Sequence, residues 1–139
     1  MAEQYTTGIC TPELFAEVKK LVQEFELDNR QMKAEQFITL CEDSLLCGFI
    51  RTWDHGTFSE MCTLGVIENK RGYGIAHSLV SSILDKSIHP VYIVTIMPSF
   101  FAEYGFTFCS EYPEAINEKL KYCISDLPVE EKYVVMKKN

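Results

Sequence analysis

Basic residues are scarce in this sequence of 139 residues. Its 13 lysines and arginines are outnumbered by 20 aspartates and glutamates, which leaves a formal charge of −7 at neutral pH. Nucleic acids and anionic membrane surfaces are bound through basic patches. The charge balance disfavours both as partners, so we expect neither nucleic acid nor a membrane among them.

Long hydrophobic runs are missing as well. The longest nearly apolar stretch runs from Val91 to Met97, whereas a membrane-spanning helix needs about 20 apolar residues. The first residues, Met-Ala-Glu-Gln-Tyr, contain neither the basic nor the apolar segment of a secretory signal. We therefore expect a cytoplasmic protein.

The cysteines lack the spacing of a metal site. The six of them form no Cys-x-x-Cys pair, and no pair of Cys and His has zinc-finger spacing. Cys41, Cys47 and Cys62 lie in apolar, strand-like runs, where a free thiol behaves as a small hydrophobic side chain. We interpret the cysteines as reduced core thiols and predict no bound metal.

Repeats, linkers and low-complexity segments are also absent from the sequence. The composition is 47% hydrophobic, which is too apolar for a disordered chain. A chain of this length buries roughly two thirds of its unfolded surface, but it is too short for a dinucleotide fold with a second substrate domain. We therefore predict a single domain over residues 1–139.

Hydrophobic periodicity predicts one helix and three strands in the first half of the chain. Thr11-Pro12-Glu13 opens the helix, because threonine caps, proline suits the first turn and glutamate suits the helix dipole. The strands are expected at Gln36–Cys41, Ser44–Trp53 and Thr57–Val66. A tight turn at Asp54-His55-Gly56 joins the last two into an antiparallel meander, with His55 as an exposed turn residue.

The second half alternates between helices and strands. The expected elements are the helix Gly72–Asp85, the strand Val91–Ile96, the short helix Pro98–Tyr104, the strand Phe106–Cys109, the helix Glu114–Tyr122 and the strand Lys132–Met136. The continuous apolar run of Val91–Ile96 is typical of a buried strand. This order of elements predicts an α/β (α+β) domain with a mixed sheet.

A glycine-bearing loop, Arg71-Gly72-Tyr73-Gly74-Ile75-Ala76, connects a predicted strand to a predicted helix. A helix start offers unpaired N–H groups and a positive dipole end, and small residues let a pyrophosphate approach them. Lys70 and Arg71 add positive charge. The alternative is that the glycines only make a turn. The loop matches neither the Walker A pattern nor the dinucleotide-binding pattern.

Two motifs resemble the GNAT acetyltransferases. Arg71-x-x-Gly74-x-Ala76 is similar to the family's Gln/Arg-x-x-Gly-x-Gly/Ala signature, whose amides hold the pyrophosphate of acetyl-CoA. Downstream, the stretch 100–106 resembles the family's second motif, a helix that ends in Gly-Phe. The resemblance runs from Gln36 to the C-terminus. It is nearest to the acetyltransferase domain of N-acetylglutamate synthase, through Glu60-Met61-Cys62, Val94-Thr95 and Phe101-x-x-x-Gly105-Phe106.

The resemblance implies a fold and a cofactor. It implies a mixed, mostly antiparallel central sheet flanked by helices, with a splayed pair of strands that holds acetyl-CoA. Gly65 is expected to mark the bulge that splays them. The cofactor-binding residues implied by the resemblance are Leu64, Gly65, Val66, Lys70, Arg71, Gly72, Tyr73, Gly74, Ile75, Ala76, His77 and Phe101.

The resemblance also assigns catalytic roles. Glu60 matches the general base, and period-two alternation places it on the same face as Cys62 and Leu64 in the absence of a bulge. Many members of the family have a tyrosine as general acid at the position of Phe101, which has no proton to donate. Water, Tyr92 or Ser99 then protonates the leaving thiolate, and the sequence does not choose among them.

The acceptor is expected to be a primary amine of a small molecule or amino acid. Arg51, Trp53 and Thr95 are the candidate acceptor-binding residues, and Lys119 and Lys121 are further candidate cations. A charge of −7 disfavours a doubly negative acceptor such as glutamate. A protein-lysine acetyltransferase and a silent acyl-CoA-binding module are the alternatives. The resemblance also allows a homodimer.

Overall fold

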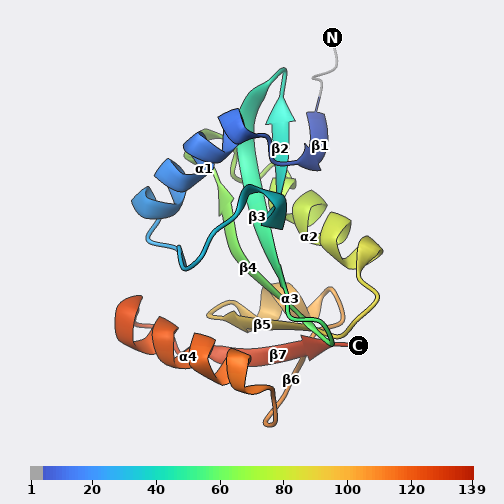
Figure 1. Cartoon of the computed structure of the whole chain (residues 1–139), viewed down its shortest axis with the longest axis vertical. Coiled ribbons are helices and arrows are strands. Elements are labelled where there is room, and N and C mark those ends of the chain that lie inside the picture. Colours follow the sequence, from blue (N-terminus) through green and yellow to red (C-terminus); the bar gives the residue numbers. More distant parts are fainter. Residues whose placement is uncertain (1–4) are drawn as a thin grey trace. The chain divides into compact units, whose positions relative to one another are not determined.

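The computed structural model describes residues 5–139 (Figure 1). The elements are β1 (Tyr5–Ile9), α1 (Pro12–Glu24), η1 (Ala34–Gln36), β2 (Phe37–Glu42), β3 (Leu45–Asp54), β4 (Ser59–Val66), η2 (Glu68–Lys70), α2 (Ile75–Lys86), β5 (Val91–Thr95), α3 (Pro98–Ala102), β6 (Thr107–Phe108), α4 (Glu114–Asp126) and β7 (Val134–Lys138). The segment in which a secretory signal was not found lies mostly outside the described residues.

The strands form a seven-stranded sheet in the order β1-β2-β3-β4-β5-β7-β6. The pairs β1–β2, β2–β3, β5–β7 and β6–β7 are antiparallel, and β4 pairs with β5 in parallel. This confirms the mixed, mostly antiparallel sheet. The parallel ladder pairs Ser59 with Val91 and Glu60 with Tyr92. The splay of β4 from β5 stays a prediction.

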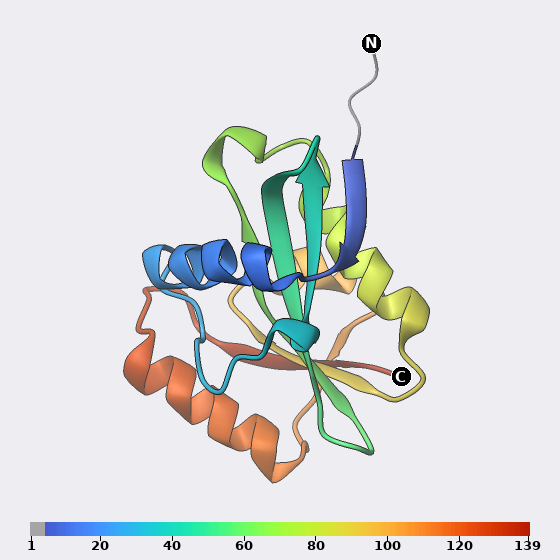
Figure 2. The same cartoon turned by 45° about the horizontal axis from the view of Figure 1, so that its top comes forward.

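Contacts divide the chain into two compact units, one of residues up to 52 with 63–86, the other of 53–62 with 87–139. In the first unit, α1 and α2 cover opposite faces of β2 and β3 (Figures 1 and 2). Val18 and Val22 of α1 pack with Phe37 and Phe49. On the other face α2 comes so close that a Cβ on Gly48 would lie 2.9 Å from the Ile75 side chain.

The start of α1 has the predicted cap. The backbone N–H of Leu14 donates to Thr11 Oγ1 at 3.2 Å, and Pro12 occupies the first turn. The turn between β2 and β3 places Asp43 and Ser44 at φ of 49° and 74°, which suits a tight two-residue hairpin. Local sequence signals therefore account for the start of α1 and for the turn between β2 and β3.

Two features of the first unit differ from the sequence-based expectation. The strand β1 was not predicted, because all five of its residues are exposed and show no alternation. The helix α2 begins at Ile75 and not at Gly72, because Gly72 and Gly74 have φ of 89° and 80°, outside the helical region.

In the second unit, α4 packs on the β5–β7 pair, and both views show it beside β7 (Figures 1 and 2). Its residue Ile116 joins Tyr92 and Val135 in a small core. The helix reaches Asp126, four residues beyond the predicted end at Tyr122. The predicted strand and helix positions are otherwise close to those observed.

All six cysteines are free thiols, and five are buried, as expected for core residues. Burial raises the pKa of Cys10, Cys41 and the half-buried Cys109 above the usual value of a thiol. Within residues 5–139, no three His, Cys, Asp or Glu side chains gather as a metal site, and no helix is long and apolar enough to cross a membrane.

Candidate active site

The loop before α2 presents a helix start to its surroundings. The first intrahelical bond runs from Ser78 N to Gly74 O at 3.1 Å, so the N–H groups of residues 75–77 precede it. Gly74 has no side chain that can cap them. A Cβ on Gly72 or Gly74 would meet no atom within 4 Å, so both lie beside open space. The geometry suits an anion on backbone amides.

The two cations of this loop also brace it. Lys70 forms an ion pair with Glu42, and Arg71 Nε donates to the carbonyl of Val66 at 3.0 Å. The guanidinium of Arg71 lies 5.3 Å from the ring centroid of Phe25. An anion at this loop would therefore depend chiefly on the amides. The predicted contacts of Tyr73 and His77, both exposed, stay predictions.

The irregular residue of β4 is Thr63, not Gly65. Thr63 has a φ of 51°, and its hydroxyl donates to the carbonyl of Asp28 at 3.0 Å. A left-handed residue inside a strand marks a bulge. The alternation that places Glu60 and Leu64 on one face is therefore interrupted between them.

Gly65 is required by packing instead. A Cβ at Gly65 would lie 2.4 Å from Cζ of Phe49, and the phenyl ring occupies the space of the absent side chain. Leu64 and Val66 on either side are half-buried. Their predicted role, backbone contact with the cofactor, stays a prediction.

Glu60 lies in a cluster of ionisable side chains in the second unit. Its side chain is 2% exposed, with Oε2 at 3.3 Å from Lys119 Nζ and Oε1 at 3.6 Å from His55 Nε2. Lys119, on α4, is 4% exposed at its side chain. A buried carboxylate thus has a buried counter-charge, and two cationic or basic groups converge on the predicted base.

Aromatic rings cover this cluster. His55 stacks between Trp53 and Phe58, with ring centroids 5.3 and 4.7 Å away and interplanar angles of 20° and 13°. Phe58 in turn meets the ring of Tyr92 edge-on at 5.6 Å. Tyr92 is the ladder partner of Glu60, so their side chains share a face of the sheet. The structure therefore brings Trp53, Glu60 and Tyr92 together.

The expectation that His55 is exposed is wrong. Its side chain is 18% exposed, although the predicted turn is present, with Gly56 N donating to Asp54 Oδ1 at 2.8 Å. His55 N donates to Phe58 O at 2.9 Å, which brings the imidazole across the hairpin onto an aromatic face. The alternation of Trp53 with His55 is the sequence signal that points to this shared face.

Arg51 is buried and bonded within its own unit, and its predicted contact with an acceptor stays a prediction. It is 0% exposed, and its guanidinium donates to Gln36 Oε1 at 2.9 Å and to the carbonyls of Arg30 and Gln31 at 2.6 and 3.1 Å. These bonds hold the segment between α1 and β2. The buried guanidinium thus satisfies loop carbonyls that would otherwise lack a donor.

The other predicted residues are placed as follows. Thr95 is buried, and its hydroxyl accepts from Met97 N at 2.9 Å at the start of α3. Ser99 is exposed on α3, and its predicted role stays a prediction. Phe101 is 3% exposed and packs against Phe100 and Phe106 with ring centroids 4.9 and 5.9 Å away. Its position gives it a packing role, and its contact with a cofactor stays a prediction.

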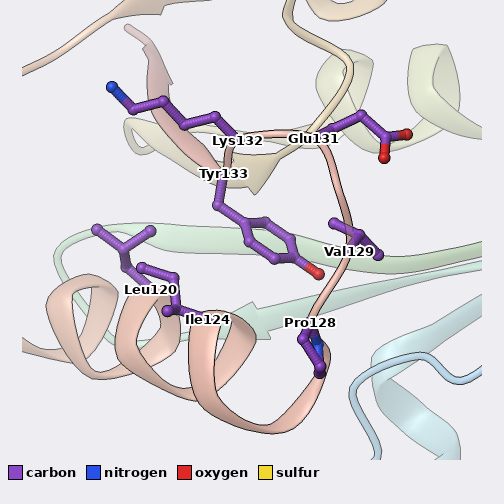
Figure 3. Close-up of a pocket in the computed structure, with 7 residues that line it drawn as sticks. All are labelled: Leu120, Ile124, Pro128, Val129, Glu131, Lys132 and Tyr133. Carbon is purple, nitrogen blue, oxygen red and sulfur yellow. The ribbon is translucent and has the colours of Figure 1, made fainter.

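A cavity of about 330 Å³ opens beside the end of α4 (Figure 3). Its lining residues are Leu120, Ile124, Pro128, Val129, Glu131, Lys132 and Tyr133. The Tyr133 hydroxyl donates to the carbonyl of Leu127 at 2.6 Å, and burial, together with Cys123 and Glu131, raises the pKa of Tyr133, while Lys119 lowers it in part. Lys119, the partner of Glu60, is thus near enough to Tyr133 to act on its pKa.

The sequence matches no protein-family profile and no curated protein. Solved structures do resemble the fold. Rv2747 from Mycobacterium tuberculosis, in complex with CoA, has a TM-score of 0.75 at 18% identity over 95% of this chain and 97% of that chain. Naa50 from Arabidopsis thaliana, in complex with the bisubstrate analogue CoA-Ac-MVNAL, has a TM-score of 0.68 at 15% identity over 97% and 98%.

N-acetylglutamate synthase from Neisseria gonorrhoeae, in complex with coenzyme A and L-arginine, has a TM-score of 0.74 at 19% identity. The match covers 94% of this chain and 32% of the synthase. The chain therefore spans about a third of the length of that enzyme. At these identities the likeness concerns the fold.

Proposed function

Since the chain has the GNAT fold, we propose that it is an acetyl-CoA-dependent N-acetyltransferase that acetylates a primary amine of a small molecule. The observation that carries this proposal is the buried carboxylate of Glu60 on β4, the strand that leads into the glycine loop and the start of α2. A group for proton transfer from the amine and amides for an anion are two requirements of acetyl transfer from a thioester.

We assign acetyl-CoA to the loop before α2. The amides at the start of this helix receive the pyrophosphate, and Gly72 and Gly74 leave the approach free of side chains. Arg71 adds positive charge while it braces the loop. Complexes of CoA with proteins of the same fold support this choice of cofactor.

We place the proton transfer in the Glu60 cluster. A protonated amine is not a nucleophile, so a base must remove its proton before the thioester carbonyl is attacked. Glu60, Lys119 and His55 bring a carboxylate, an ammonium and an imidazole together. Tyr92 lies on the same face and supplies a hydroxyl for the leaving thiolate.

We propose an acceptor with an apolar part and not a dicarboxylate. The cavity beside α4 is lined largely by aliphatic side chains and Tyr133. Arg51 and Lys119, two of the cations that glutamate would need, are engaged with groups of the protein. The charge of −7 also repels a dianion.

A screen of acceptors tests the function. The whole protein is incubated with acetyl-CoA and a panel of aliphatic and aromatic amines, amino acids and peptides, and free CoA is measured through its thiol. We expect release with small amines that carry an apolar group. Faster release with peptides supports the protein-lysine alternative.

A silent acyl-CoA-binding module is the second candidate. The observation that favours it is Phe101, which is buried and has no proton for a leaving thiolate. This module would bind acetyl-CoA in calorimetry and release no CoA with any amine.

We further propose a single domain over residues 1–139, a cytoplasmic location and a homodimer. Light scattering measures the mass of the particle in solution and so tests the dimer. A mass of one chain at working concentration contradicts it.

A further inference from the structure

The carboxylate of Glu60 is closed off from solvent. Its side chain is 2% exposed, and its two oxygens face Lys119 and His55. A general base must come within about 3 Å of the proton that it takes, or reach it through one water. An acceptor amine therefore meets this cluster through one of the two neighbours of Glu60.

Lys119 serves as counter-ion in this cluster. Its side chain is 4% exposed, and its Nζ lies 3.3 Å from the carboxylate. A buried ammonium needs a negative charge beside it in a protein interior. The geometry thus assigns the carboxylate of Glu60 to Lys119 as its counter-charge.

His55 is the most exposed member of the cluster. Its side chain is 18% exposed, and stacking between Trp53 and Phe58 fixes the plane of its ring. Its Nε2 is buried, lies 3.6 Å from Glu60 Oε1 and has no hydrogen-bond partner among residues 5–139. Catalytic contacts of this length shorten once substrate binds. Imidazole is also the side chain best suited to exchange protons near neutral pH.

We propose that His55 takes the proton of the acceptor's ammonium group, while Glu60 and Lys119 position the imidazole and balance its charge. This inference rests on the proposed acetyl transfer. The free amine attacks the thioester carbonyl carbon, a C–N bond forms and the C–S bond breaks. Of the two protons that leave the nitrogen, one passes through His55 to water and the other ends on the sulfur of CoA.

Several titratable groups surround His55. The titratable groups on elements packed around it are Asp54 in the turn, Glu60 on β4, Tyr92 on β5, Lys119 on α4 and Lys137 on β7. Asp54 accepts from Gly56 N, and Lys137 lies over the ring of Tyr92 at 5.5 Å. Glu60 is thus the carboxylate that faces Nε2, with Lys119 on its other oxygen.

The variant His55→Phe tests the proposal, because it keeps an aromatic ring in the stack and removes both nitrogens. At pH 7 we expect kcat to fall by ~10²-fold or more, with the KM for acetyl-CoA changed by less than about twofold. The deficit shrinks as pH rises, and with a weakly basic analogue of the acceptor, because such amines arrive already unprotonated. Imidazole added to His55→Ala restores turnover. The control His89→Phe changes a histidine outside the cluster.

The outcomes are distinct. A wild-type kcat in His55→Phe at pH 7 overturns the role of His55 and leaves the proposed function standing. A loss that is equal at every pH, equal for both amines and unaffected by imidazole assigns His55 a structural role and also overturns it. If wild-type protein releases no CoA with any amine, the proposed function fails, and the inference falls with it. His55→Gln gives the same readouts if His55→Phe does not fold.

Discussion

Glu60 is a buried carboxylate on a strand, and its charge is paired with that of a buried lysine. This residue was predicted as the base from its resemblance to a motif, and the structure adds Lys119 and His55 to it. The neighbours change what the carboxylate can do, because one of its oxygens is paired with a buried lysine and the other faces an imidazole.

Replacing Glu60 with glutamine keeps its size and removes its charge. We expect kcat to fall by ~10²- to 10⁴-fold, since the imidazole loses the charge that stabilises its protonated form, while the Kd for CoA is retained. Thiol release and calorimetry measure the two quantities. The control is Glu118→Gln, at an exposed position of α4. Unchanged turnover at saturating acceptor would remove Glu60 from the reaction.

Gly65 is fixed by close packing. In Gly65→Ala the new Cβ would lie 2.4 Å from Cζ of Phe49, so the ring must shift. We expect the free energy of unfolding to drop by about 1–3 kcal/mol in urea denaturation. The matched control is Gly8→Ala, whose Cβ would meet no atom within 4 Å. Equal stability of the two variants is the result that contradicts this packing.

The sequence assigns residue roles only where a local motif carries them. Gly74 and Glu60 belong to such motifs, and their roles stay predictions. The engagement of Arg51 with the carbonyls of Arg30 and Gln31 depends on how a loop returns to β3, and no local pattern encodes that. The same holds for Lys119, whose partner lies on a distant strand.

At the scale of elements, the junction of the loop with α2 shows best how glycine sets a helix boundary. Gly72 and Gly74 have positive φ, outside the helical region, so the helix starts after them. Periodicity alone predicts the helix but sets its start too early, because the apolar spacing says nothing of φ at Gly72 and Gly74.

Replacing Gly74 with valine tests this junction. Its φ of 80° strains a β-branched residue, and the side chain would enter the space expected for the pyrophosphate. We expect the Kd for CoA to rise by ~10-fold or more, as about 1.4 kcal/mol of lost binding implies.

The matched control for this prediction is Gly56→Val. Gly56 also has a positive φ, 94°, with no atom within 4 Å of a Cβ, but it lies in the β3–β4 turn. Similar losses of thermal stability in both variants, with weaker CoA binding in Gly74→Val alone, are the expected pattern. Normal CoA affinity in Gly74→Val argues against the phosphate loop.

Strands differ in how far sequence reveals them. The strands β2 to β5 have apolar runs with buried residues and were predicted close to their observed positions. The edge strand β1 exposes every residue, so it has no burial pattern to detect. Backbone pairing places it beside β2, and the Thr39 hydroxyl also donates to the carbonyl of Gly8 at 3.3 Å.

At the scale of the whole molecule, the sheet order could not be derived from local pattern. The strand β7, last in the chain, enters between β5 and β6. This pairing joins distant segments, which no local pattern encodes. The order of elements predicted a mixed sheet, and the resemblance to a known fold added that it is mostly antiparallel. The acidic charge, by contrast, is visible in the composition and constrains the proposed acceptor.

Tyrosine ionisation sets an alkaline limit on stability. Burial raises the pKa of Tyr104 and Tyr133 in the folded protein, with nearby Glu103 and Glu131 adding to the rise. A group whose folded pKa is raised contributes its full stability below the unfolded pKa, about 10 for tyrosine, and loses it as pH rises through the folded pKa. We therefore expect the tyrosines to lower Tm above about pH 10. The raised thiol pKa values of Cys10, Cys41 and Cys109 lower it by the same rule from about pH 8.5.

The variant Tyr133→Phe checks this sign. It removes one of the two tyrosine titrations, so the fall of Tm with alkaline pH becomes shallower than in the wild-type protein. Thermal melts between pH 8 and pH 11 measure the slope. Identical slopes in the two proteins are incompatible with this origin of the alkaline limit.

The contact between Glu60 and Lys119 has a consequence for how the sequence can evolve. A chain that loses either charge alone keeps the other buried without its match, at a cost of about 3–5 kcal/mol, while a chain that loses both is relieved of that penalty. The route from one pairing to another therefore passes through an unfavourable single mutant. Substitutions at the two positions should therefore occur together, so residues 60 and 119 are expected to covary among homologues.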